Sequence, residues 1–211
     1  MKNLYIVGAR GFGRKVFCIA KESIGYGEDF VIAGFLDDKK EALDGYEGYP
    51  PIISSVENYE IKPNDVFICA LGDVTYKKKY IDILRDKGAD FITLIHKTAC
   101  FEQNVKLGAG CIISSGVKIC CDTTIGDFNT FQPYVVVGHD VMIGNYCHFN
   151  TFCFMGGFVK IDDMATIQTS AVILPHKRVS SFSVVGAGAV VLRNVNTGIT
   201  VFGNPAVKLK Q

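Results

Sequence analysis

Apolar residues recur along this chain with two different periods, and the period changes near residue 90. Before Asp90, short apolar runs alternate with longer polar segments, as in an α/β unit. After Asp90, every sixth residue is apolar without interruption. We therefore predict two domains, over residues 1–90 and 91–211.

The first domain is predicted to be a Rossmann-like α/β unit, with a small parallel sheet and helices between its strands. Apolar runs indicate four strands, at residues 4–7, 30–36, 66–70 and 91–94. Amphipathic segments indicate two helices, at residues 14–23 and 76–86.

Glycine or aspartate follows each of the first three predicted strands. Ligands of parallel sheets bind beyond the carboxyl ends of the strands, so we expect these residues to line one crevice. The candidate substrate-binding residues are Gly8, Gly11, Gly13, Asp37, Asp38 and Gly72.

Two other interpretations of these glycines stay open. They could serve only tight turns, because a short glycine-rich loop is a weak signal. A nicotinamide cofactor could also bind here. However, the spacing is G-x-x-G-x-G rather than G-x-G-x-x-G, and about 90 residues supply only half of a dinucleotide fold.

The second domain is predicted to be a parallel β-helix built from hexads. Starting at Ile95, seventeen residues spaced by six are all apolar, although only 48% of the chain is hydrophobic. The fifth residue of each hexad is small or β-branched, except Asn129 and Lys177. Six second positions are glycine, as expected where a short strand turns a corner. Three hexads make a coil of 18 residues, so residues 18 apart should stack about 4.8 Å apart.

The repeat also predicts how this protein assembles. Each coil is stabilised only by its neighbours, and the long flat outer faces of the prism need covering. A closed homotrimer with three prisms side by side is the natural solution.

Composition excludes several classes of partner. With 22 basic and 21 acidic residues, there is no electrostatic case for binding nucleic acid or an anionic membrane surface. The N-terminus lacks the apolar core of a secretory signal, and no apolar run approaches the roughly 18 residues of a membrane span. We expect a cytoplasmic protein that does not insert into membranes. Its eight cysteines should be reduced packing residues, since their spacing does not match zinc ligands.

Of the four histidines, His139 is the candidate for catalysis. It is the third residue of its hexad, at a corner where a side chain can project outward. Asp140 could orient one ring nitrogen and leave the other as a general base. His148 lies half a coil away, and His176 lies about 10 Å along the same edge as His139. This separation argues against the three-histidine zinc site of a γ-class carbonic anhydrase, and we expect no metal.

The order of motifs resembles the NeuD-type sugar O- and N-acetyltransferases over essentially the whole chain. The motifs are Ile-Val-Gly-Ala-x-Gly-x-Gly-Arg, Phe-Leu-Asp-Asp, Ala-Leu-Gly-Asp, Leu-Ile-His-Lys, Gly-His-Asp-Val-x-Ile-Gly and Gly-Asn-Pro-Ala. The resemblance implies a left-handed β-helix, a trimer with three inter-subunit sites, and acetyl-CoA as co-substrate. It makes His139 the general base and Asp140 its orienting partner, without an acyl-enzyme.

The same resemblance assigns further residues. His148 and Gly157 match positions near the thioester and pantetheine, and Gly157 lies near amides that could stabilise an oxyanion. The coenzyme groove is matched by Thr169, Gly186 and Ala187. The nucleotide-linked sugar is matched by Gly11, Gly13, Asp37 and Asp38. The chain departs from the family pattern at Arg10, at Phe12 and at Asp140, where glutamate is common.

Three functional hypotheses follow from this reading. The first is acetyl transfer from acetyl-CoA to an amino group of a nucleotide-linked amino sugar, for surface polysaccharide synthesis. The second is O-acetylation of sialic acid or a related sugar hydroxyl. The third, from a different class, is a non-catalytic β-helix scaffold or nucleotide sensor.

Overall fold

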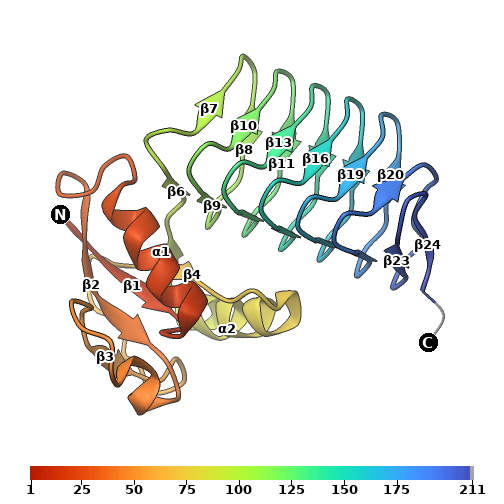
Figure 1. The fold of residues 1–211 in the computed structure, drawn as a ribbon. Helices are drawn as coiled ribbons and strands as arrows, with labels where there is room; N and C mark the ends of the chain where they lie inside the picture. Colours follow the sequence, from red (N-terminus) through yellow and green to blue (C-terminus); the bar gives the residue numbers. More distant parts are fainter. Residues whose placement is uncertain (210–211) are drawn as a thin grey trace. The chain divides into compact units, whose positions relative to one another are not determined.

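The computed structural model describes residues 1–209, and the chain divides into two compact units, Met1–Lys97 and Thr98–Gln211 (Figure 1). The first unit mixes helices and strands, and the second consists of short strands alone. Within residues 1–209, no helix has the length and apolar character that crossing a membrane requires.

The first unit is built on a five-stranded sheet in the order β3-β2-β1-β4-β5, with all strand pairs parallel. Its strands are β1 (Lys2–Val7), β2 (Phe30–Leu36), β3 (Ile52–Ser54), β4 (Asp65–Cys69) and β5 (Asp90–Phe91). Its other elements are α1 (Gly11–Lys21), the 3₁₀ helix η1 (Lys40–Leu43), α2 (Val74–Asp86) and β6 (Leu94–Ile95). The strand order reverses between β1 and β4, and this reversal opens a crevice at their carboxyl ends.

The predicted α/β unit is confirmed, with three differences in its elements. Strand β3 was not predicted, because it has only three residues and lies at the sheet edge. The strand predicted at residues 91–94 is divided into β5 and β6. Helix α1 starts at Gly11, three residues early. Glycine is required at Gly13, because a Cβ there would overlap the carbonyl oxygen of Gly8.

The second unit is a β-helix with three faces, each a ladder of two-residue strands (Figure 1). One face contains β7 (Cys100–Phe101), β10 (Lys118–Ile119), β13 (Val136–Val137), β16 (Phe154–Met155), β19 (Val172–Ile173) and β22 (Val190–Val191). The next contains β8 (Lys106–Leu107), β11 (Thr124–Ile125), β14 (Met142–Ile143), β17 (Lys160–Ile161) and β20 (Arg178–Val179). The third contains β9 (Ile112–Ile113), β12 (Thr130–Phe131), β15 (His148–Phe149), β18 (Thr166–Ile167), β21 (Val184–Val185), β23 (Thr200–Phe202) and β24 (Val207–Lys208).

The predicted stacking of residues 18 apart is confirmed on all three faces. Ile119 pairs with Val137, and Ile125 pairs with Ile143. From Ile113 to Val191, every first residue of a hexad is buried. Identical side chains stack inside the prism, as with Phe131 and Phe149, whose ring centroids are 4.6 Å apart.

The corners of the prism are formed by the fourth residue of each hexad. In fifteen consecutive hexads, starting with the one at Phe101, this residue has a φ between 56° and 66°. Twelve of these residues are not glycine, although the left-handed conformation costs roughly 1–2 kcal/mol per residue. Their amides are bonded between coils, since Asp140 N–H donates to Cys121 O and Phe158 N–H donates to His139 O.

The second-position glycines have a different role from the one expected. They do not adopt a positive φ, so the corner conformation does not explain them. Instead, the next coil approaches too closely for a side chain. A Cβ on Gly138 would lie 2.8 Å from the amide nitrogen of Gly157, and a Cβ on Gly144 would overlap the Asp163 carboxylate.

The fifth residue of each hexad is inside the prism, and its polar side chains bind carbonyls of neighbouring coils. Asn129 is fully buried, and its Nδ2 donates to Gly126 O at 2.9 Å and to Gly144 O at 2.8 Å. Its Oδ1 accepts from the amide of Cys147 at 2.8 Å. These three bonds explain why an amide side chain occupies this position.

Replacing Asn129 with alanine should lower the free energy of unfolding by about 3 kcal/mol, because buried carbonyl and amide groups lose their partners. The position can hold alanine, since Ala165 occupies it two coils farther along. Chemical denaturation measures the loss. As a control, Cys147→Ala removes only weak thiol contacts from the same column and should cost about 1 kcal/mol. Equal losses in the two variants would contradict this account.

Candidate active site

His139 lies at the corner between β13 and β14, where it forms a pair with the next residue. Its Nδ1 is 2.8 Å from Asp140 Oδ2, and both side chains are about half exposed. Asp140 occupies the left-handed fourth position, with a φ of 56°. A carboxylate at Nδ1 favours the tautomer with the proton on Nδ1, which leaves Nε2 free to accept a proton.

The coil above holds the imidazole in place. Gly157 lies 18 residues after His139, and a Cβ there would be 2.6 Å from both Cε1 and Nε2 of the ring. The Phe158 ring meets the imidazole edge to face, with 5.2 Å between ring centroids. The absence of a side chain at Gly157 therefore makes the space that the His139 ring occupies.

The amide of Gly157 differs from its equivalents in the repeat. At the same hexad position, Asp127 N–H donates to Asn145 Oδ1 and Asn145 N–H donates to Asp163 Oδ1, each acceptor lying one coil above. Pro175 stands above Gly157 and offers no such acceptor. Within residues 1–209, no hydrogen bond satisfies the Gly157 N–H, so it remains available to bind an oxygen atom of a ligand.

The structure separates the other predicted coenzyme residues from His139. His148 is in β15 on the third face, nearly buried, with its Nε2 3.5 Å from Gln132 Nε2. Thr169 follows β18, and Gly186 and Ala187 follow β21, at the edge between the third face and the β13 face. Within one chain, only His139, Asp140 and Gly157 therefore come together at one edge.

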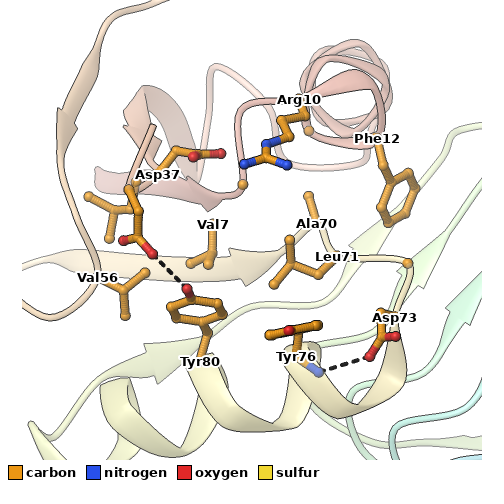
Figure 2. A pocket seen from close by; sticks show the side chains of 15 residues that line it. Val7, Arg10, Phe12, Asp37, Val56, Ala70, Leu71, Asp73, Tyr76 and Tyr80 are labelled. Carbon is orange, nitrogen blue, oxygen red and sulfur yellow. Dashed lines mark hydrogen bonds between the residues drawn. The ribbon is translucent and has the colours of Figure 1, made fainter. Parts of the chain in front are cut away.

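A cavity of about 520 Å³ lies in the first unit, at the carboxyl ends of the strands. It is lined by residues that follow β1, β2 and β4, together with side chains of α2 (Figure 2). Among the predicted substrate-binding residues, the cavity is lined by Gly8, Gly13, Asp37, Asp38 and Gly72. Gly11, which was also predicted, is not part of the lining.

The two aspartates in this cavity have different partners. Asp37 is bound to backbone through both oxygens: Oδ2 accepts from Ala9 N–H at 2.8 Å and Oδ1 from Lys39 N–H at 2.9 Å. Asp38 Oδ2 accepts from the Tyr80 hydroxyl at 2.7 Å. That hydrogen bond, with burial, raises the pKa of Tyr80 to about 12. Asp37 therefore holds the loops together, whereas Asp38 keeps one oxygen for a ligand.

Several residues of the cavity were missed by the sequence reasoning. Tyr76 and Tyr80 rise from α2 toward the strand ends, and Arg10 extends over the cavity from the opposite side (Figure 2). The two tyrosines are four residues apart on one face of a predicted helix, and this spacing is a signal that could have found them. Val56 follows the unpredicted strand β3, in a segment without a clear apolar period.

No metal site accompanies these residues in the described part of the chain. No group of three or more His, Cys, Asp and Glu side chains within residues 1–209 is arranged to hold a metal ion. His96 forms a pair with Glu22, with 2.6 Å between Nε2 and Oε2.

Comparisons with known proteins support one family over the whole chain. Residues 3–84 match the PglD N-terminal domain, and residues 90–188 match the GMPPB C-terminal domain. The GDP-perosamine N-acetyltransferase of Escherichia coli O157:H7 is 33% identical over 235 aligned positions, covering 99% of this chain and 97% of that protein. This chain belongs to the NeuD-type family of hexapeptide-repeat acyltransferases.

Solved structures of the family share the fold of this acyltransferase. The acetyltransferase domain of PglB from Neisseria gonorrhoeae FA1090 superposes with a TM-score of 0.88 and 25% identity, covering 99% of this chain and all of that domain. PerB from Caulobacter crescentus, solved with CoA and GDP-perosamine, also gives 0.88 and 25%, covering 100% and 98% of the two chains. The predicted α/β unit followed by a left-handed β-helix is confirmed.

Replacing Gly157 with alanine should lower kcat on the order of 10²-fold, because the new methyl group displaces the His139 ring from its position. The melting temperature should barely change, since the φ of Gly157 suits any residue. Steady-state kinetics and thermal unfolding measure both effects. Ser181→Ala, at the same hexad position on another edge, should leave kcat unchanged. A fully active Gly157 variant would show that the ring does not depend on this space.

Proposed function

We propose that this protein transfers an acetyl group from acetyl-CoA to an amino group of a nucleotide-linked amino sugar. The observation that carries the proposal is the His139–Asp140 pair, exposed on the β-helix with an open imidazole nitrogen. The separate cavity of about 520 Å³ has the size and polarity for a nucleotide sugar. The relatives named as GDP-perosamine N-acetyltransferases support both reactants.

In this mechanism His139 acts as general base and then as general acid. Acetyl-CoA supplies the acetyl thioester when it is bound. As the sugar amine attacks the thioester carbonyl, Nε2 of His139 accepts the amine proton. The new C–N bond forms, the C–S bond breaks, and the imidazolium returns the proton to the leaving sulfur. Asp140 stabilises the imidazolium, and the Gly157 N–H is suited to bind the transient oxyanion.

The two remaining hypotheses predict different chemistry. O-acetylation of sialic acid or a related sugar hydroxyl uses the same base, but the acceptor carries no nucleotide. A scaffold or nucleotide sensor has no turnover. The names of the relatives favour N-acetylation, since they act on a GDP-linked amino sugar.

We also propose a homotrimer that works in the cytoplasm. The expected coenzyme residues lie on two edges and one face of the prism, so a neighbouring protomer is needed to gather them around one ligand. The eight free cysteines suit a reducing compartment.

The variant His139→Asn keeps the polarity of the site but removes the base, so turnover should fall by roughly 10² to 10⁴. Release of the CoA thiol reports the reaction, with GDP-, UDP- and dTDP-linked amino sugars as acceptors. The wild-type protein should acetylate at least one of them. Turnover only with a free sugar hydroxyl would support O-acetylation, and no turnover with any acceptor would support the sensor.

The two aspartates of the cavity should separate binding from stability. Asp38→Asn should raise KM for the nucleotide sugar about tenfold, because a charged hydrogen bond to the ligand is lost. Its melting temperature should stay close to that of the wild type. Asp37→Ala should instead lower the free energy of unfolding by about 2 kcal/mol, since two backbone amides lose their acceptor. The opposite pattern would reverse the assignment of the two residues.

A further inference from the structure

One residue breaks the packing rule of the β-helix interior. From Cys111 to Val195, the fifth residue of every hexad is at most 3% exposed, except Lys177. The residues directly below and above it in the same column are Val159 and Val195, both buried. Lys177 is only partly buried.

A lysine in this column does not serve stability. An ammonium group loses hydration where it approaches an apolar column, and valine fits the positions on both sides. A position where a sequence breaks its own packing pattern is often functional. The question is therefore what Lys177 faces.

Lys177 opens onto a second cavity of about 440 Å³. The cavity is lined by Phe158, Lys160, His176, Lys177, Arg178 and Asn194. Within residues 1–209, no carboxylate pairs with Lys160 or Lys177, while Arg178 is bound to Asp162 at 2.8 Å. The cavity therefore carries excess positive charge, which suits phosphate groups.

One wall of this cavity is aromatic. The rings of Phe158 and His176 are stacked, with centroids 4.8 Å apart and planes within 6°. Both residues occupy the left-handed corner position, so their side chains lie in one column along the edge.

This cavity lies on the same edge as His139. Phe158 and His176 follow Asp140 by 18 and 36 residues, so they are about 5 and 10 Å along the prism axis. A thioester at His139 belongs to a coenzyme whose remaining length must extend along the protein surface. The nucleotide sugar has its own cavity in the first unit.

We propose that Lys160, Lys177 and Arg178 bind the phosphate groups of coenzyme A, with the Phe158–His176 stack as the adjoining wall. This assignment rests on the proposed function, because it takes acetyl-CoA as the co-substrate. It explains why a lysine replaces valine in the interior column at this coil and at no other between Cys111 and Val195.

The decisive variant is Lys177→Val, which restores the valine column. Isothermal titration calorimetry without acceptor should show a Kd for coenzyme A that is roughly tenfold higher than in the wild type. The Kd for pantetheine, which has no phosphate, should not change. The melting temperature should rise by about 2–4 °C, because the charge leaves the apolar column. A merely structural lysine would not produce this combination.

A second variant and a matched control guard against misfolding. Lys160 is exposed, so Lys160→Met should fold normally and also weaken coenzyme A binding several-fold. Lys106→Met removes an exposed lysine from the same face and hexad position, three coils away, and should leave the Kd unchanged.

Three results would overturn the assignment. The first is an unchanged Kd for coenzyme A in both cavity variants. The second is wild-type protein that binds pantetheine as tightly as coenzyme A. The third is a weakened affinity for GDP or UDP instead, which would give the cavity to the acceptor. Phosphate-dependent binding of coenzyme A without acetyl transfer to any sugar would refute the proposed function and leave this assignment standing.

Discussion

The hydrogen bonds between coils determine almost everything in the second unit. A two-residue strand has no partner within its own coil, so its amides must bind the coil above, as Lys118 N–H binds Val135 O and Thr124 N–H binds Val141 O. This requirement holds the register at 18 residues across all three faces. Each side chain consequently has a fixed neighbour one coil away, and a local choice of residue becomes a choice about a column.

The candidate active site uses this register directly. The His139 ring fits because the residue one coil above it is Gly157, and the Gly157 amide is open because the residue above that is Pro175. No loop or domain closure is needed to explain these contacts within the edge. The same regularity makes Lys177 conspicuous, since its column is otherwise apolar or small. In a repeat protein, a break in a column carries more information than a match.

The first unit follows another physical rule. Its cavity arises where the order of parallel strands reverses, so three separate turns contribute to it. Adjacent aspartates there divide the work, because backbone amides occupy both oxygens of Asp37 and a tyrosine hydroxyl occupies one oxygen of Asp38. Family membership and the fold thus agree with a chain that handles a nucleotide-linked reactant and a thioester in separate units.

The sequence alone determined the hexad period, the coil length, the His139–Asp140 pair and the glycine–aspartate turns, because each is encoded by residues close together in the chain. The tertiary structure alone decided why the second-position glycines are needed, which aspartate is free, and that Thr169 and His139 occupy different edges. It also brought Tyr80 to Asp38 across 42 residues. These features depend on which distant side chains and backbone atoms approach each other, and that is set by stacking and strand order rather than by local pattern.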